Sequence, residues 1–312
     1  MSAFPVFDPA SSLARPITQL TSITFWLGLG VFLLVAGLLS WFMWRYRHRG
    51  AGGEPAQIFG NTRDEVGWIL GAVALVGVLL FLTVRVAGQS SPDTAGPNPD
   101  VYVTAHQWYW AFRTPGGAET AGELHIPAGR RVLLDLTSAD VIHDFSVPQL
   151  ARKIDVIPGQ HNRLWIEAAK AGTYAGECNE FCGPQHAWMR FRVIADDAAS
   201  LAGAGPDSPA PTLVAGSAAA HGAQVFREVQ CSACHAVQGQ TSDFPHDGAV
   251  GPDLTHFASR QLMAGGVLTN TPANVQRWLK HTQQVKPGAR MPTLPLSDQE
   301  INDLSAYLEA LK

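Results

Sequence analysis

Cys178-Asn-Glu-Phe-Cys-Gly-Pro-Gln-His-Ala-Trp-Met189 is the most informative segment of this 312-residue chain. Two cysteines stand four residues apart, a histidine follows after four more, and a methionine after another three. His143 lies about 35 residues upstream, at the edge of a predicted strand in the segment VIHDFSVP. Thiolate, imidazole and thioether groups are ligands that suit copper, and on a β-sandwich they are typical of electron-transfer sites. A loop that aims both sulfurs inward can bridge two copper ions, each with one terminal histidine.

The same spacing is compatible with other roles for these residues. Cys178 and Cys182 could form a disulfide in an oxidising compartment, or they could bind structural zinc together with His143 and His186. The histidines and Met189 could also be ordinary core residues. A disulfide leaves the positions of the histidines and Met189 unexplained, and zinc rarely recruits methionine, so copper is favoured.

The residues around this segment predict an all-β sandwich over 100–195. Short runs rich in β-branched and aromatic residues, such as 101–112 and 131–138, alternate with turn signals such as Pro115-Gly116-Gly117. This pattern is typical of two packed antiparallel sheets. Strand alternation predicts that Trp108 and Trp110 lie on one face of a strand and Tyr109 on the other.

Two uncharged apolar runs, at 25–44 and 66–84, precede the sandwich. Each is close to the roughly 20 residues that a helix needs to cross the hydrocarbon core of a membrane. They predict a tail at 1–22 and a transmembrane hairpin at 23–88, with helices at about 23–44 and 66–86 and a loop at 45–65. The loop carries Arg45, Arg47, Arg49 and Arg63. The positive-inside rule therefore predicts a cytoplasmic loop, with both termini and the soluble domains on the periplasmic face of a bacterial inner membrane, in contact with lipid.

The C-terminal part is predicted to be a small all-α domain over 217–312, after a flexible linker at 196–216 that is rich in Ala, Gly, Pro and Ser. Cys231-Ser-Ala-Cys234-His235 has the C-x-x-C-H spacing that attaches haem c through two thioethers, with His235 as the proximal iron ligand. A redox-active C-x-x-C pair is the alternative. The histidine that follows at once and the helical surroundings favour haem.

The haem iron needs a second axial ligand, and Met291 in the segment GARMP is the best candidate. It lies in a proline-flanked loop before the predicted C-terminal helix, where a loop can cover the haem face. Methionine with histidine raises the haem potential above that of bis-histidine ligation, as an electron donor to copper requires. The domain resembles class I cytochrome c, including a haem-packing loop at 251–254. The other candidate ligands are Met263, His246, His256 and His281.

Composition excludes several other classes of protein. Charged residues make up only 15% of the chain and the net charge is −4, so the basic excess of a nucleic-acid-binding protein is missing. Four cysteines are too few for a disulfide scaffold of this size. The sequence therefore predicts no nucleic-acid partner.

The segment CNEFCGPQHAWM, with HDFSVP and AHQWYWAF upstream, resembles subunit II of the haem-copper cytochrome c oxidases over roughly residues 15–195. The resemblance implies a cupredoxin fold that carries CuA, a dinuclear copper centre. Cys178 and Cys182 would bridge the two ions, and His143 and His186 would be their terminal ligands. Met189 and the backbone carbonyl of Glu180 would be the weak axial ligands.

The resemblance also implies three roles outside the copper ligands. The side chain of Glu180 would bind Mg²⁺ at the interface with subunit I. Trp108 would be the exposed indole at which electrons enter from a cytochrome. Glu65, in an E-x-x-W context with Trp68, would stand at the mouth of a proton channel in subunit I, and Asp64 could serve instead.

Together these features predict the subunit through which electrons enter a proton-pumping cytochrome c oxidase. An upstream cytochrome or respiratory complex would reduce the haem, which would pass electrons to CuA and on to the haems of subunit I, where O₂ is reduced to water. Two membrane helices leave no room for the haem-copper bundle, so the chain would be part of an enzyme only as a subunit. The alternatives are a CuA-bearing small subunit of a nitric oxide reductase and a membrane-anchored redox carrier without an oxidase partner.

Overall fold

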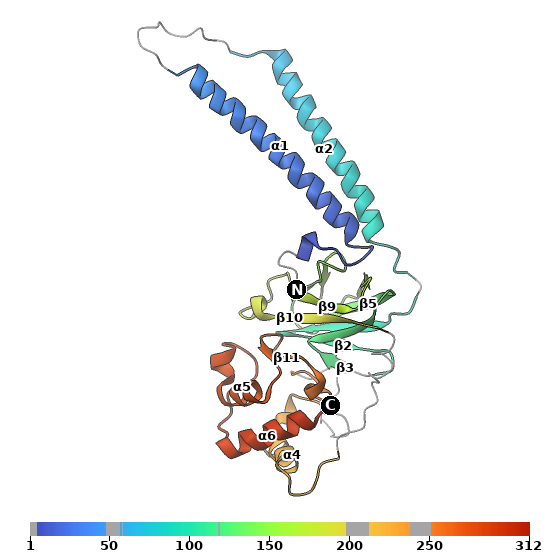
Figure 1. Cartoon of the computed structure of the whole chain (residues 1–312), viewed down its shortest axis with the longest axis vertical. Coiled ribbons are helices and arrows are strands. Elements are labelled where there is room, and N and C mark those ends of the chain that lie inside the picture. The colour runs from blue at the N-terminus through green and yellow to red at the C-terminus, as the bar shows by residue number, and fades with distance from the viewer. Residues whose placement is uncertain are drawn as a thin grey trace. The chain divides into compact units, whose positions relative to one another are not determined.

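The computed structural model describes residues 5–47, 57, 59–95, 97–117, 119–197, 212–237 and 251–312 (Figure 1). The chain divides into two compact units, one of Arg15–Pro92 and one of Met1–Ala14 with Asp93–Lys312. The first unit is a pair of long helices. The second contains the β-sandwich and the C-terminal helical domain.

The helical unit consists of α1 (Arg15–Arg45) and α2 (Thr62–Ser90), which pack against each other. Both helices are long and apolar enough to cross a membrane, with mean hydropathy of 2.2 and 2.5 in their most apolar windows. The first helix begins at Arg15, so the predicted helix start near residue 23, after a tail at 1–22, is wrong. The polar turn before the apolar run is also helical, and within it the Thr21 hydroxyl donates to the Ile17 carbonyl at 2.9 Å.

The residues just before α1 are in contact with the sandwich. Leu13 and Ala14 are buried at 1% exposure, and the Ser11 hydroxyl donates to the Leu150 carbonyl at 2.6 Å. The tail therefore packs against the sandwich through apolar contact and hydrogen bonds. Most of the predicted linker at 196–216 lies outside the described residues, which omit 198–211.

The sandwich has two five-stranded sheets, in the orders β3-β2-β1-β5-β8 and β4-β10-β9-β6-β7. Most neighbouring strands are antiparallel, but β1 pairs with β5, and β10 with β4, in parallel. The strands are β1 (Val101–His106), β2 (Tyr109–Arg113), β3 (Glu119–Ala121), β4 (Glu123–Pro127), β5 (Arg131–Ser138), β6 (His143–Ser146), β7 (Ile154–Val156), β8 (Asn162–Glu167), β9 (Gly172–Cys178) and β10 (Arg190–Asp196).

An aromatic cluster fills the space between the two sheets. Trp110, Phe145 and Phe191 are almost fully buried, and the Phe145 and Phe191 ring centroids are 4.7 Å apart. Gly176 lies under the Phe191 ring, where a Cβ atom would overlap the ring. This core fixes the pairing of β6 with β9, in which Phe145 stands opposite Cys178. His143 and Cys178 are thereby brought to the same end of one sheet.

The C-terminal domain is built on α4 (Ala218–Glu228), α5 (Pro272–Val285) and α6 (Asp298–Ala310). Thr271 caps α5, and a capping box of Ser297 and Glu300 begins α6, as the sequence pattern predicts. Phe226 and Tyr307 pack edge to face between α4 and α6. The domain is not purely helical, because β11 (Leu262–Met263) and β12 (Leu268–Thr269) form a short antiparallel pair. Short 3-10 turns are η1 (Pro5–Phe7), η2 (His186–Trp188), η3 (Cys231–Ala233) and η5 (Phe257–Ser259).

Candidate metal and haem sites

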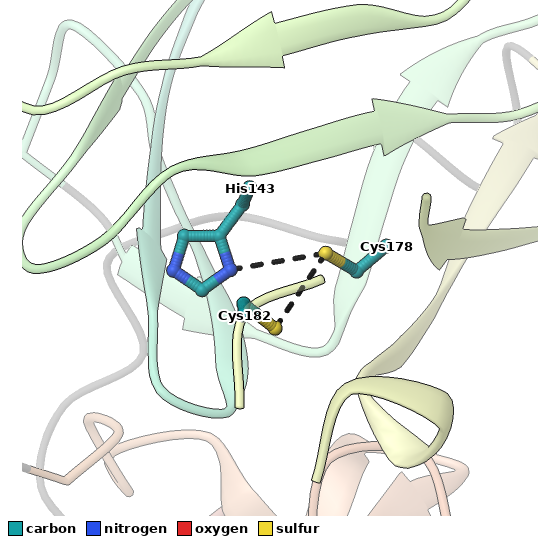
Figure 2. A group of neighbouring side chains, drawn as sticks. All are labelled: His143, Cys178 and Cys182. Carbon is teal, nitrogen blue, oxygen red and sulfur yellow. Dashed lines mark hydrogen bonds between the residues drawn. The ribbon is translucent and has the colours of Figure 1, made fainter. Parts of the chain in front are cut away.

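The first site is a buried cluster of two thiols and an imidazole at one end of the sandwich. Cys178 ends β9, Cys182 lies in the loop that follows, and His143 begins β6. The Cys178 sulfur is 3.8 Å from the Cys182 sulfur and 3.8 Å from His143 Nδ1, and both interactions are drawn in Figure 2. The ligand atoms of the three residues all lie within 4.8 Å of one another. A disulfide has a sulfur–sulfur distance of about 2.05 Å, so this geometry does not match the disulfide alternative.

The remaining sequence-predicted donors surround the two sulfurs. His186 Nδ1 is 3.6 Å from the Cys182 sulfur, and the Met189 sulfur is 3.9 Å from it. The Glu180 carbonyl oxygen is 3.3 Å from the Cys178 sulfur. Each thiol therefore has one imidazole nitrogen and one weaker donor beside it. This paired set of soft donors fits two bridged copper ions better than a single tetrahedral zinc ion.

A carboxylate that the sequence analysis did not single out orients His143. Asp140 accepts a hydrogen bond from His143 Nε2 at 2.8 Å, which leaves Nδ1 facing the Cys178 sulfur. Carboxylates commonly orient metal-binding histidines in this way. Burial disfavours the charged form of Asp140, but hydrogen bonds from His143 and from the backbone outweigh it and lower its pKa. A hydrogen bond from Cys182 lowers the pKa of the Cys178 thiol, which favours the thiolate form that binds metals.

Trp108 lies in the turn between β1 and β2, so the expectation that it shares a strand face with Trp110 is wrong. The chain reverses at 107–108, and His106 pairs directly with Tyr109. Trp108 is half-buried instead of exposed, and its indole N–H donates to the Cys182 carbonyl at 3.0 Å. The side-chain amide of Gln107 donates to the same carbonyl at 2.7 Å. Both residues therefore contact the candidate copper site.

The second site is a cavity of about 250 Å³. Cys231, Cys234, His235 and Met291 all line it, which brings together every residue predicted to hold haem. Phe226, Leu279 and Leu304 contribute apolar walls of the kind that a flat hydrophobic cofactor needs.

The two predicted axial ligands are positioned by different segments. His235 Nδ1 lies 2.8 Å from the Pro252 carbonyl, so Nε2 is the nitrogen left for a metal. Gln283, on α5, donates to the carbonyl oxygens of Ala289 and Met291, each at 2.7 Å, and so holds the loop that carries Met291.

The other candidate axial ligands are less well placed. Met263 also lines the cavity, but it is packed in the domain core at 6% exposure. His256 and His281 are not among the lining residues. His246 lies outside the described residues.

Arg260 is a second residue that sequence reasoning missed. It lines the cavity and is 8% exposed, and one of its terminal nitrogens donates to the Asp253 carbonyl at 2.5 Å. Its Nε atom is buried and has no partner in the described part of the chain. A buried guanidinium with an open donor suits the carboxylate groups of haem, so the donor set of this cavity fits that cofactor.

Fold and sites together define a protein with two candidate membrane-spanning helices, a cupredoxin-like sandwich and a C-terminal cytochrome c domain. Residues 118–195 match the family described as cytochrome c oxidase subunit II, periplasmic domain, and residues 219–312 match cytochrome c. The chain is 35% identical over 296 residues to cytochrome c oxidase subunit 2 of Alkalihalophilus pseudofirmus, a match that covers 90% of this chain and 83% of that protein. The chain belongs to the cytochrome c oxidase subunit II family.

Two further similarities accompany this match. The chain is 34% identical over 277 residues to cytochrome c oxidase subunit 2 of Bacillus subtilis, which covers 83% of this chain and 77% of that protein. A crystal structure of the periplasmic domain of subunit II of cytochrome oxidase from Bradyrhizobium japonicum is 32% identical, with a TM-score of 0.33, and covers 34% of this chain and 91% of that one.

Family membership has direct consequences for the chemistry of the chain. The sandwich implies copper and the cytochrome c domain implies haem. The chain is a subunit of an oxidoreductase complex, and subunit I of that complex is its expected partner. Family membership also supports a role for the chain in the entry of electrons into the complex. Together with the two apolar helices, membership indicates a bacterial membrane protein with a periplasmic domain.

Proposed function

We propose that this chain carries electrons from haem c in its C-terminal domain to a dinuclear CuA centre, and from there to the haems of subunit I in a proton-pumping cytochrome c oxidase. There O₂ would be reduced to water. One observation carries the proposal: Trp108 lines the haem cavity, and its indole donates to the carbonyl of Cys182. A single residue therefore contacts both candidate redox sites.

The copper centre would be held by the residues that converge at the end of the sandwich. Cys178 and Cys182 would bridge the ions, with His143 and His186 as terminal ligands. Met189 and the Glu180 carbonyl would complete the set. Bound copper supplies reversible one-electron transfer. The protein keeps both thiols buried at 5% and 3% exposure, and it fixes the His143 ring through Asp140.

The haem would be attached through Cys231 and Cys234, and His235 and Met291 would be the ligands of its iron. Ligation by histidine and methionine raises the potential of a haem above that of a bis-histidine haem. Pro252 holds the His235 ring, Gln283 holds the Met291 loop, and Arg260 offers its free N–H to a haem carboxylate.

Two acidic residues would act outside the electron path. The Glu180 side chain is exposed, as a ligand for Mg²⁺ shared with subunit I would have to be. Glu65 lies in the first turn of α2, where we place the entrance to a proton channel of subunit I. The neighbouring Asp64 carboxylate accepts a hydrogen bond from the Asn61 side chain at 2.8 Å, which favours Glu65 for this role. Proton uptake by the purified complex should fall in a Glu65→Gln variant and not in Asp64→Asn.

The orientation proposed for the chain has the 45–65 connection in the cytoplasm and both soluble domains in the periplasm of the inner membrane. An upstream cytochrome or respiratory complex would be the electron donor. The reported relatives are all oxidase subunits, which favours an oxidase over a nitric oxide reductase or an unpartnered carrier.

Purification of the complex from native membranes tests the proposal. We expect two copper ions and one haem c per chain, a mixed-valence copper signal, a-type haem in a co-purifying subunit, and O₂ uptake. Zinc in place of copper would overturn the assignment of the sandwich site. Reduction of nitric oxide without O₂ uptake would overturn the assignment of the complex.

A further inference from the structure

The haem cavity is walled by residues of both soluble domains. Gln107, Trp108, Tyr109 and Ala121 of the sandwich line it together with residues of the cytochrome c domain. The Trp108 face of the sandwich is therefore covered by a domain of the same chain. The groups that hold this contact include two buried charges, one from each domain.

Lys286 is the first buried charge. It directly follows α5 and is only 4% exposed. Its ammonium donates to the Ala264 carbonyl of its own domain at 3.1 Å and to the Trp108 carbonyl of the sandwich at 3.3 Å. Burying an ammonium is unfavourable unless hydrogen bonds replace its water. One of the two hydrogen bonds that replace water here is accepted by the sandwich. Burial lowers the pKa of Lys286 to about 8, consistent with a contact that excludes water.

Glu123 is the second buried charge, at the start of β4 in the sandwich, with 1% exposure. One carboxylate oxygen accepts two backbone N–H groups of the cytochrome c domain, from Gln261 at 2.8 Å and from Leu262 at 2.9 Å. Such charge-assisted hydrogen bonds are stronger than neutral ones. The Arg192 guanidinium adds a bond to the Gln261 side chain at 2.7 Å.

Between these two points the backbones of the two domains touch. The Arg190 N–H donates to the Gly265 carbonyl at 3.0 Å. Gly265 has φ of +71°, and a Cβ atom there would lie 2.7 Å from the Trp108 carbonyl oxygen. Only glycine combines this conformation with so close an approach.

The contact continues along the loop that leads to Met291. Arg290 donates to the Gln107 side chain at 2.6 Å, and Gln107 in turn donates to the Cys182 carbonyl. Gln185, next to the proposed ligand His186, donates to the Pro287 carbonyl. The loop that would supply a haem ligand is thus bonded to the loop that would supply copper ligands.

We infer that Lys286 and Glu123 form a two-point latch that holds the cytochrome c domain on the sandwich with its haem cavity against Trp108. The functional role of this latch rests on the proposed function, because docking affects activity only if electrons pass between the two sites. Both are positioning residues: Glu123 does not line the haem cavity, and Lys286 lines it but acts through its bonds to the Ala264 and Trp108 carbonyls. The occupant of the Trp108 face is the chain's own haem domain, so an external donor has to deliver its electrons to that domain.

Hydrogen exchange in the intact oxidase complex tests the latch directly. The amides of Gln261 and Leu262 are protected in the docked state because Glu123 accepts them. Glu123→Ala leaves two buried N–H groups without an acceptor, which should weaken docking by roughly 10- to 100-fold. Lys286→Met removes the other point. We expect faster exchange over 261–266 in both variants, including in Lys286→Met, where Glu123 is intact.

A second measurement separates docking from cofactor loading. In both variants the rate of electron transfer from haem to copper should fall, while copper content and haem content stay as in the native complex. Both potentials should also stay native in Glu123→Ala, because Glu123 does not line the haem cavity. Glu123→Gln keeps one acceptor oxygen without the charge and should fall between the native protein and Glu123→Ala. Lys280→Met, on the exposed face of α5, and Glu228→Gln, on the exposed face of α4, are matched controls and should behave like the native complex.

The outcomes distinguish the latch from the proposed function. Native exchange over 261–266 in both Lys286→Met and Glu123→Ala would overturn the latch, whatever the electron-transfer rates. Protection that is lost in the variants, with no electron transfer from haem to copper even in the native complex, would support the latch and overturn the proposed function. If one variant does not assemble, the other carries the same test.

Discussion

Truncation of Asp140 should weaken copper binding, although Asp140 is not itself a predicted ligand. Its carboxylate accepts hydrogen bonds from His143 Nε2 at 2.8 Å and from the backbone N–H groups of Gln107 at 2.6 Å and Val141 at 2.7 Å. Val141 is exposed, so water can replace part of that bond in an alanine variant. His143 is fully buried, so its N–H would be left without an acceptor and its ring without a fixed orientation.

The magnitude follows from the His143 bond. A hydrogen bond to a charged group contributes about 1.5–3 kcal/mol, which corresponds to roughly 10- to 100-fold in affinity. Asp140→Ala should therefore lower copper affinity by roughly that factor. Asp140→Asn keeps an acceptor oxygen but not its charge, and should lose roughly 10-fold or less.

Copper affinity is measured by competition with a chelator, and the mixed-valence signal reports whether both ions are bound. Asp196→Asn is the matched control, because Asp196 also bonds a histidine, His125, at 2.7 Å, in a pair without any sulfur ligand. Native copper affinity in Asp140→Ala would refute the reasoning, because it would mean that His143 is oriented without this carboxylate.

Three further changes have defined outcomes. Met291→Ala should leave haem attached through the cysteines but lower its potential, and an unchanged potential in a redox titration would exclude Met291 as the axial ligand. Gly176→Ala should destabilise the sandwich by ~1–3 kcal/mol, seen as a lower Tm, because the added Cβ overlaps the buried Phe191 ring. The pKa of Lys286 is lowered from 10.5 to about 8 when the domains are docked, so the docked state binds fewer protons and gains stability as pH rises through that window. The Tm should therefore rise between about pH 7.5 and 9.5 in the native protein and stay flatter in Lys286→Met, and equal slopes would contradict the burial of this charge.

Local sequence was sufficient wherever ligands are close together in the chain. Cys178, Cys182, His186 and Met189 fall within one short segment of the chain, and their spacing alone suggests a shared site. His143 required only the expectation that its strand edge lies beside that loop, which the pairing of β6 with β9 confirms geometrically. The roles of these residues as ligands remain proposals.

Residues that act across long chain separations could not be found in this way. Gln107 and Lys286 matter because a turn of the sandwich meets a loop of the cytochrome c domain, and no local pattern encodes that meeting. The predicted position of Trp108 is wrong because side-chain alternation assumes a continuous strand, whereas the chain turns at 107–108. Asp140 was within reach, because a carboxylate three residues before a predicted histidine ligand is a usable signal.

Contact between the two redox domains relies largely on main-chain groups. Lys286 binds carbonyl oxygens and Glu123 binds amides, and every residue type offers these groups except that proline lacks the N–H. The side chains at 262 and 264 therefore take no part in the bonds that these two charges make. We expect a haem domain grafted from a relative to dock on this sandwich if it keeps the lysine, the glycine turn, a non-proline residue at 262, and the side chains of Arg290 and Gln261 that bond Gln107 and Arg192. We therefore expect the two soluble domains to be exchangeable between relatives that keep these groups.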